Sequence, residues 1–360
     1  MLKDAVDLTS IRRALVVKLR HHGDVLLTSP VFTVLKNHAP HIEIDALVYR
    51  ATEEMLTLHP AIANVFAVDR EWKKHGPLHQ FTQELRLIQM LRARDYDLLI
   101  HLTEHARGAW FSHLLGPRYG VAHDFPRKRG RLWRHSFSHL YKLPTTPRHT
   151  VEQHLDALRR IGVYPGAEER RLVLVPGPTA EQSVQAFAAQ HGLAERGYIH
   201  VHPTSRWLFK CWPEDNMVAL IDALQRAGER VVVTAAPERA ELEMIQRIVA
   251  RLERPVLDLS GQLSLKQLAA LTARAKCFVG VDSVPMHIAA AMQTPVVALF
   301  GPSNEQLWGP WQVRQRVLTV PYSCRPCGLD GCGGGKRSEC LEAVPVNEVL
   351  DAIRQVTQPV

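Results

Sequence analysis

Short apolar runs alternate with amphipathic stretches along most of the chain, and this alternation predicts the fold class. Apolar runs rich in β-branched residues, such as 14–19 and 42–48, predict buried strands, whereas 81–93 has the spacing of a helix. The alternation restarts in the second half, where the predicted strands are 198–202, 230–234, 277–281 and 295–300. Strands that alternate with helices favour parallel sheets, so we predict an α/β protein with two doubly wound, Rossmann-like domains.

Composition supports an ordinary globular protein. The 360 residues are 46% hydrophobic and 22% charged, and no apolar run approaches the ~18 residues of a membrane-spanning helix. The first residues are charged and lack the apolar core of a signal peptide, so we expect a cytoplasmic protein. A segment with Pro and Gly at 162–166 predicts a linker, which divides the chain into domains 1–165 and 166–360.

The positive charge is concentrated in the first domain. Residues 1–165 hold 24 Lys and Arg against 16 Asp and Glu, whereas residues 166–360 hold 20 of each. Such asymmetry is typical of a domain that meets nucleic acid, anionic lipid or a phosphorylated substrate, although a plainly basic surface would look the same.

The first candidate for chemistry follows the first predicted strand. Ligands of open α/β sheets bind beyond the carboxyl ends of the strands, and Asp24 stands at such a place. Its carboxylate suits either the N-cap of the next helix or a general base. His21 and His22 are rival bases, and together with Gly23 they are equally compatible with an ordinary polar loop.

Two loops of the second domain suit phosphate. Thr204, Ser205 and Lys210 precede a predicted helix near Pro213, where hydroxyls, a point charge and the helix dipole would favour an anion. Asp282 and Ser283 precede a helix rich in alanine, whose first backbone N–H groups could hold a diphosphate. The structural alternatives are a capped loop and a capped buried helix. The absence of Gly-x-Gly-x-x-Gly and of a Walker A lysine argues against nicotinamide dinucleotides and P-loop chemistry.

Two further clusters lie outside these loops. The spacing Cys-x2-Cys-x4-Cys-x7-Cys could close a zinc or iron–sulfur site, but it matches no standard zinc ribbon, and we predict reduced thiols and no metal. These cysteines are Cys324, Cys327, Cys332 and Cys340. The densest basic run could grip phosphate or form a solvated loop, and it contains Arg127, Arg129 and Arg131.

Taken together, several segments resemble the bacterial lipopolysaccharide heptosyltransferases, glycosyltransferase family 9. The resemblance covers nearly the whole chain and rests on residues 15–30, 210–213, 281–291 and 299–303. Three features resemble the heptosyltransferase III branch in particular, namely residues 21–24, residues 284–287 and the cysteine segment 324–340.

The resemblance implies a GT-B fold, with two Rossmann-like domains facing an interdomain cleft. It implies an inverting transfer of L-glycero-D-manno-heptose from ADP-L-glycero-β-D-manno-heptose to a phosphorylated inner-core acceptor, without a divalent metal or other cofactor. In the third branch the product carries a side heptose on the second core heptose. The first domain would bind the acceptor and the second the nucleotide sugar.

The resemblance also implies roles for single residues. Asp24 matches the proposed base of the family, and Glu238 matches its ribose-binding acid. The remaining donor-binding residues would be Thr204, Ser205, Lys210, Asp282, Ser283, Met286 and His287. For the acceptor we expect contacts from His21, His22, Gly23, Arg127, Arg129 and Arg131. Many members have Gly-Leu where this chain has Val284-Pro285, and a proline has no N–H to offer a diphosphate.

Other functions stay open at this point. The chain could be a heptosyltransferase of the first or second type, a GT-B enzyme for another nucleotide sugar, or a non-catalytic member of the fold. Outside these, it could be a basic nucleic-acid-binding protein with a Cys-rich zinc element. We expect no nucleic-acid partner and instead expect transient contact with the cytoplasmic face of the inner membrane. Thermal stabilisation by ADP, UDP or GDP would separate these alternatives.

Overall fold

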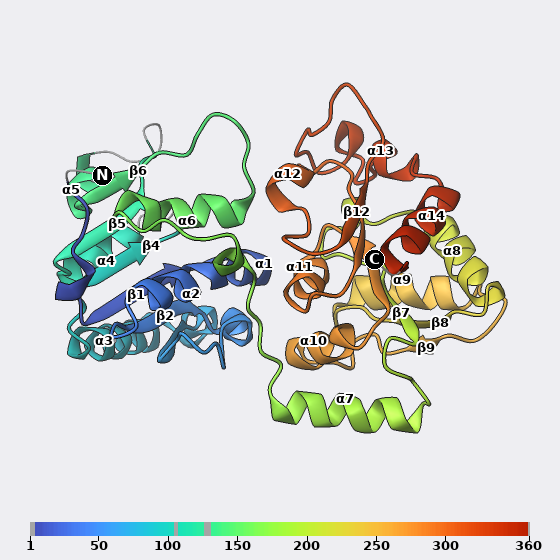
Figure 1. Ribbon diagram of the computed structural model, residues 1–360, viewed down its shortest axis with the longest axis horizontal. Helices are drawn as coiled ribbons and strands as arrows, with labels where there is room; N and C mark the ends of the chain where they lie inside the picture. Colours follow the sequence, from blue (N-terminus) through green and yellow to red (C-terminus); the bar gives the residue numbers. More distant parts are fainter. Residues whose placement is uncertain (1–3, 104–106, 126–130, 359–360) are drawn as a thin grey trace. The chain divides into compact units, whose positions relative to one another are not determined.

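The computed structural model describes residues 4–103, 107–125 and 131–358, and the chain forms two compact units, Met1–Val175 and Pro176–Val360. Each unit contains one parallel sheet of six described strands with helices packed on it (Figure 1). The predicted pair of doubly wound α/β domains is therefore confirmed. Within the described ranges, no helix combines the length and the apolar character that crossing a bilayer would require.

The sheet of the first unit has the strand order β3-β2-β1-β4-β5-β6. Its strands are β1 (Arg13–Lys18), β2 (Glu43–Tyr49), β3 (Asn64–Val68), β4 (Leu98–His101), β5 (Tyr119–His123) and β6 (His139–Tyr141). After Arg13 every residue of β1 is buried, as expected for a central strand covered on both faces.

Helices cover both faces of this sheet. They are α1 (His22–Leu26), α2 (Ser29–His38), α3 (Pro77–Ala93), α4 (Arg107–Leu115), α5 (Arg131–Ser136) and α6 (Thr150–Arg160). Leu15 and Val17 of β1 pack in one cluster with Leu87 of α3 and Phe111 of α4. Because side chains alternate along a strand, Lys18 points to the opposite face, where it meets α6.

The boundary between the units lies at 175/176. The 3-10 turn η4 (Glu168–Arg170) belongs to the first unit, because Asn37 of α2 donates a hydrogen bond to Glu169 at 3.0 Å. The backbone N–H of Val173 likewise donates to the hydroxyl of Ser29 at 2.9 Å. These contacts attach residues 166–175, which the sequence analysis assigned to the second domain, to α2.

The sheet of the second unit repeats the first, with the order β12-β11-β10-β7-β8-β9. Its strands are β7 (Tyr198–His202), β8 (Arg230–Val233), β9 (Leu257–Asp258), β10 (Cys277–Val281), β11 (Val296–Leu299) and β12 (Gln315–Leu318). The helices of this unit are α7 (Pro178–Gln190), α8 (Glu214–Arg226), α9 (Arg239–Val249), α10 (Leu265–Ala273), α11 (Val284–Ala291), α12 (Glu305–Trp308), α13 (Glu339–Glu342) and α14 (Val346–Thr357).

In each sheet, successive strands are added first on one side and then on the other side of the starting strand, and the point between these two halves is the switch point. In the first sheet this switch point lies between β1 and β4, and in the second it lies between β7 and β10. Loops that leave neighbouring strands in opposite directions open a crevice there, and ligands of doubly wound sheets bind in it.

Candidate functional site

Asp24 lies beyond β1, in the first turn of α1, and not at its N-cap. The N-cap is His21, which makes no capping hydrogen bond with its side chain, so the N-cap interpretation of Asp24 is wrong. The Asp24 carboxylate is 4.0 Å from the ammonium of Lys18 and 3.9 Å from the guanidinium of Arg20. Its side chain keeps 15% of its surface exposed, so the carboxylate is reachable from outside.

The Lys18 ammonium next to Asp24 is held by groups from two other elements. It donates to the backbone carbonyl of Leu102 at 3.0 Å and lies 2.9 Å from Nε2 of His154 on α6. Because an ammonium can only donate, Nε2 accepts, and the His154 proton resides on Nδ1, 3.0 Å from the carbonyl of Leu27. Burial, together with the charge of Lys18, holds the pKa of His154 well below its usual range, so this imidazole is neutral.

The other acceptor candidates of the first unit are dispersed. His22 Nε2 is 2.7 Å from the carbonyl of Ala51, in the 3-10 turn η2 (Arg50–Met55) that follows β2. Gly23 is buried, and Arg131 is exposed at the start of α5. Arg127 and Arg129 lie outside the described residues. The structure thus brings His21, His22, Gly23 and Asp24 together at one turn, whereas Arg131 belongs to a different helix.

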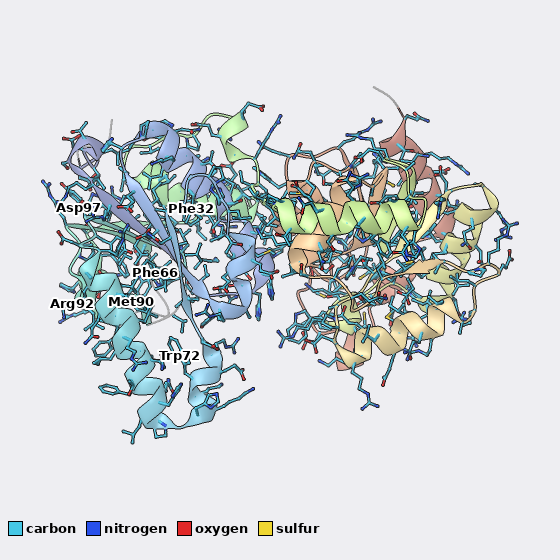
Figure 2. The ribbon with its side chains drawn as sticks, turned by 90° about the horizontal axis from the view of Figure 1, so that it is seen from below. Phe32, Phe66, Trp72, Met90, Arg92 and Asp97 are labelled. Atoms are coloured by element: carbon cyan, nitrogen blue, oxygen red, sulfur yellow. The ribbon has the colours of Figure 1, made fainter. Side chains whose placement is uncertain are left out.

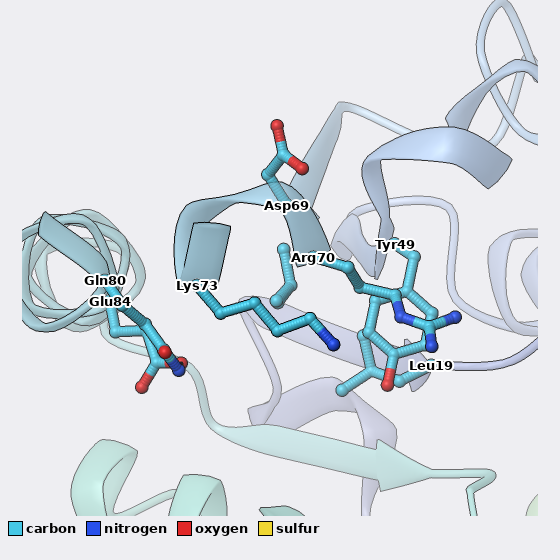
Figure 3. Close-up of a pocket in the computed structure, with 8 residues that line it drawn as sticks. Leu19, Tyr49, Asp69, Arg70, Lys73, Gln80 and Glu84 are labelled. Atoms are coloured by element: carbon cyan, nitrogen blue, oxygen red, sulfur yellow. The ribbon is translucent and has the colours of Figure 1, made fainter. Parts of the chain in front are cut away.

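A polar pocket that the sequence analysis missed lies beyond the carboxyl ends of β1, β2 and β3 (Figure 3). Its volume is about 240 Å³, and its lining contains Leu19, Tyr49, Val68, Asp69, Arg70, Lys73, Gln80 and Glu84. Arg70 stacks over the ring of Tyr49, with 5.2 Å between guanidinium carbon and ring centroid. Arg70 and Lys73 come from the 3-10 turn η3 (Arg70–His75), while Gln80 and Glu84 face them from α3. Two cations, two carboxylates and a ring suit a polar, sugar-like ligand, and Arg70 and Lys73 could also meet a phosphate group on it.

In the second unit, Lys210 and Asp282 form a contact ion pair. Lys210 ends the 3-10 turn η5 (Leu208–Lys210) after β7, and Asp282 directly follows β10. The Lys210 ammonium is 2.5 Å from the Asp282 carboxylate, and the side chains keep 23% and 10% of their surfaces exposed. The pair therefore joins the two loops at the switch point of the second sheet.

The candidate hydroxyls beside this pair are already engaged. Thr204 is buried and donates to the carboxylate of Glu241 at 2.6 Å, and Ser205 accepts a hydrogen bond from the backbone of Trp207 at 3.3 Å. Burial raises the pKa of Glu241, although the Thr204 hydroxyl opposes this shift. Glu238, the predicted ribose-binding acid, is exposed at the N-cap of α9. The sequence analysis missed Glu241, which α9 places one turn further on.

The helix α11 begins beside Asp282 but has no side-chain cap. Its N-cap is Ser283, whose hydroxyl donates instead to the carbonyl of Val281 at 3.3 Å. The N–H of Met286 donates to the Ser283 carbonyl at 3.2 Å. The side chains of Met286 and His287 are buried, so both face the interior of the unit.

The strand β7 carries two further buried histidines. The ring nitrogens of His200 and His202 lie 2.7 and 2.8 Å from the hydroxyl of Thr234, and a second nitrogen of His200 lies 3.0 Å from the hydroxyl of Thr272. Burial lowers the pKa of each histidine to about 3, so both are neutral parts of the core.

The cysteine segment is fixed to the same end of the second sheet. The hydroxyl of Ser338 donates to the carbonyl of Phe209 at 2.6 Å, and Arg325 donates to the carbonyl of Gly301 at 2.6 Å. Cys324, Cys327, Cys332 and Cys340 are free thiols. Nowhere in residues 4–103, 107–125 and 131–358 do three His, Cys, Asp or Glu side chains form an arrangement suited to a metal ion.

Comparison with known proteins places this geometry in a family. Residues 84–336 match the model of glycosyltransferase family 9 (heptosyltransferase). Lipopolysaccharide heptosyltransferase 3 of Escherichia coli is 34% identical over 294 residues, which cover 81% of this chain and 84% of that protein.

Two solved structures share the fold. A family 9 glycosyltransferase from Veillonella parvula has a TM-score of 0.84 and 24% identity, with 99% of each chain covered. The Escherichia coli heptosyltransferase WaaC, solved with ADP, has a TM-score of 0.72 and 23% identity, covering 95% of this chain and 99% of that one. The arrangement of both sheets is therefore that of GT-B heptosyltransferases.

Proposed function

The chain belongs to glycosyltransferase family 9, the heptosyltransferases, and from this premise we propose that it transfers L-glycero-D-manno-heptose from ADP-heptose to a heptose of the lipopolysaccharide inner core, as an enzyme of the third type. The observation that carries the proposal is the Lys210–Asp282 pair, which sets a cation at the switch point of the second sheet. A nucleotide diphosphate in that crevice would meet both the ammonium and the start of α11.

The donor is assigned to the second unit. WaaC, which shares the fold, was solved with ADP. An incoming diphosphate would compete with Asp282 for Lys210, because phosphate oxygens carry more charge than one carboxylate. Thr204 and Glu241 would position this loop from within. Glu238 and Ser283 stay proposed donor-site residues at the N-caps of α9 and α11. Met286 and His287 stay proposed donor-site residues that would act by fixing α11 from the interior.

The reaction would proceed by one displacement. The oxygen of the acceptor hydroxyl attacks the anomeric carbon of the heptose, its proton passes to the carboxylate of Asp24, and the bond from that carbon to the diphosphate oxygen breaks. The electron pair of that bond leaves with ADP, and attack from the opposite face inverts the anomeric centre. Lys210 would stabilise the charge that builds on the departing oxygen. With this fixed cation and the positive end of the α11 dipole, we propose that no divalent ion is required.

The acceptor is assigned to the first unit, where the pocket with Arg70 and Lys73 lies beyond the same strand ends as Asp24. Arg70 and Lys73 suit phosphate groups on the inner core, and Arg131, which does not line this pocket, stays a proposed acceptor-binding residue on α5. His21, His22 and Gly23 shape the turn that carries the base. The 34% identity to a heptosyltransferase 3 favours a side heptose as the product, over the products of the first and second types.

We place the enzyme in the cytoplasm, in transient contact with the inner membrane and without a nucleic-acid partner. Membership of family 9 favours catalysis over the alternative of a nucleic-acid-binding protein with a zinc element.

The decisive experiment is mass spectrometry of heptose transfer. Purified protein with ADP-heptose and EDTA would be given inner cores that lack the first, second or side heptose. Transfer to the core that lacks only the side heptose supports the whole proposal. Transfer only to a shorter core would assign the enzyme to the first or second type. Activity that appears only after metal is added would refute the proposed metal independence. No transfer from ADP-heptose to any core would refute the proposed donor and acceptor together.

A further inference from the structure

Exposed apolar side chains are concentrated on two neighbouring helices of the first unit. Among the described side chains, twelve large hydrophobic ones are exposed, and six of these belong to α3 and α4. They are Leu78, Phe81, Leu85, Met90, Trp110 and Leu114. Only Leu87 and Leu91 of the seventeen residues of α3 are buried, so this helix gives little of its apolar surface to the core.

The exposed residues of α3 form a stripe. Leu78, Phe81 and Leu85 recur with the three- and four-residue spacing of one helix face. The stripe continues into an apolar groove of about 330 Å³, which is lined by Val68, Glu84, Leu87, Ile88, Trp110, Phe111 and Leu114. We call the stripe and the groove together the α3–α4 face. Figure 2 shows α3 at the outer side of its unit, beside the turn that carries Trp72.

Cations border the α3–α4 face. Residues 70–92 contain five Lys and Arg against two Asp and Glu. Lys74, Arg86 and Arg92 are exposed, and Arg92 is labelled on α3 in Figure 2. The polar pocket with Arg70 and Lys73 adjoins the apolar groove, because both are lined by Val68 and Glu84. An exposed apolar face bordered by cations is complementary to a lipid surface with anionic headgroups.

We infer that the α3–α4 face docks this enzyme onto an anionic membrane surface, with Phe81 and Trp110 entering the headgroup region and Arg86 and Arg92 meeting the headgroups. The inference rests on the proposed function, since it assigns a surface to the membrane contact that a lipid-borne acceptor requires. Docking there would bring the adjoining polar pocket next to the membrane, where sugars attached to a lipid emerge.

The test is retention on vesicles, measured by co-sedimentation. The full-length protein binds vesicles of equal parts phosphatidylcholine and phosphatidylglycerol, and pure phosphatidylcholine retains it less. The double variant Phe81→Ser and Trp110→Ser lowers retention at least about tenfold, because two large apolar side chains no longer enter the lipid. The matched control is Tyr164→Ser with Leu329→Ser, which removes two exposed apolar residues elsewhere and leaves retention unchanged.

A second variant tests the cations. Arg86→Gln with Arg92→Gln lowers retention on the anionic vesicles and makes retention less sensitive to salt, while binding to phosphatidylcholine stays as it is. Heptose transfer to an acceptor freed of its acyl chains stays within about twofold of the wild type for both double variants, since neither touches the polar pocket. This assay separates the two ideas, because vesicle binding without any transfer would refute the proposed function alone.

Three results would overturn the inference. One is equal retention of the wild type and the Phe81→Ser, Trp110→Ser variant, and another is retention that does not depend on phosphatidylglycerol. The third is a wild-type dimer in solution that this variant converts to a monomer, because a second copy of the chain would then cover the α3–α4 face.

Discussion

Each unit sets a lysine beside an aspartate at its switch point, and the two pairs differ. In the first unit the ammonium of Lys18 is 4.0 Å from the Asp24 carboxylate and is held by the Leu102 carbonyl and His154. In the second unit the Lys210 ammonium lies 2.5 Å from Asp282. The first cation is fixed by neutral groups and leaves its carboxylate at a distance, whereas the second is neutralised directly by its partner.

This difference suits the two proposed roles. A general base must accept a proton, and a cation in direct contact would compete for its lone pairs. A lysine that receives a diphosphate gains from a resident carboxylate, which stabilises the partly buried ammonium until the substrate replaces the carboxylate. Similar residue types at equivalent strand ends can therefore serve proton transfer in one unit and anion binding in the other.

The largest expected effect comes from breaking the first pair at its carboxylate. Asp24→Asn keeps the shape of the side chain but removes its basicity, so we expect kcat for heptose transfer to fall about 100- to 10,000-fold. The control is Glu43→Gln, which alters a carboxylate beside Arg13 and Arg94 at the amino end of β2, the end of the strands opposite to Asp24. Unchanged turnover in Asp24→Asn would remove Asp24 from the role of base.

Removing the lysine of the second pair should lower catalysis less than the Asp24→Asn substitution does. Lys210→Met removes one preorganised cation from the departing diphosphate, and we expect kcat/KM for ADP-heptose to fall on the order of 100-fold. Lys276→Met is the matched control, because the Lys276 ammonium also lies 2.5 Å from a carboxylate, that of Glu229, elsewhere in the same unit. Equal losses in both variants would mean that Lys210 acts only on folding.

A third variant tests how the first cation is held. Lys18→Met leaves the Leu102 carbonyl and the His154 ring without this donor, so we expect the free energy of unfolding to drop by about 1–3 kcal/mol. We also expect turnover to fall about tenfold, since Asp24 loses its neighbour. Lys36→Met, which removes a donor to the carbonyl of Ile42 alone, should leave turnover unchanged. Urea unfolding and initial rates measure the two effects, and an active, equally stable Lys18→Met would contradict this account.

The smallest effect concerns the buried histidines of the second unit. The pKa values of His200 and His202 are lowered to about 3, whereas an unfolded histidine titrates near 6.5. As the pH falls, the unfolded chain therefore binds these protons before the folded chain does. The contribution of the two histidines to the free energy of unfolding is greatest above pH 6.5 and falls as the pH decreases toward 3. Between pH 7 and pH 6 we expect a loss of about 1 kcal/mol, and urea unfolding at the two pH values measures it. His202→Asn should reduce the loss, whereas the exposed His135→Gln should not.

Local patterns were enough to predict the central strands of both sheets, whereas β5, β6 and β12 were not predicted. The buried runs that became β1, β7 and β10 were visible because β-branched residues cluster there and turns follow. The residues placed after strands, Asp24, Lys210 and Asp282, lie at the switch points for the same reason: the end of a strand is a local property, and the topology of alternating elements is nearly fixed.

Contacts between distant segments could not be predicted in this way. His154 is 136 positions from Lys18, and no periodicity in either segment indicates that the two meet. Glu241 was missed in favour of Glu238, because which of two acids on a short stretch turns inward depends on where α9 begins. The N-cap interpretation of Asp24 was wrong because α1 starts two residues earlier, at His22.

The hydrogen bonds of the two clusters have a consequence for how such enzymes diversify. Lys18 is held by Leu102 and His154 of the first unit, whereas Lys210 pairs with Asp282 and Thr204 with Glu241 in the second unit. Each of these partners belongs to the same unit as the side chain that it holds, so we expect substitutions that change the choice of acceptor to leave these contacts of the nucleotide-binding unit intact. Gene duplication could thus yield enzymes that use the same sugar donor but transfer to different acceptors. Exchanging the first units between relatives should transfer the acceptor specificity with them.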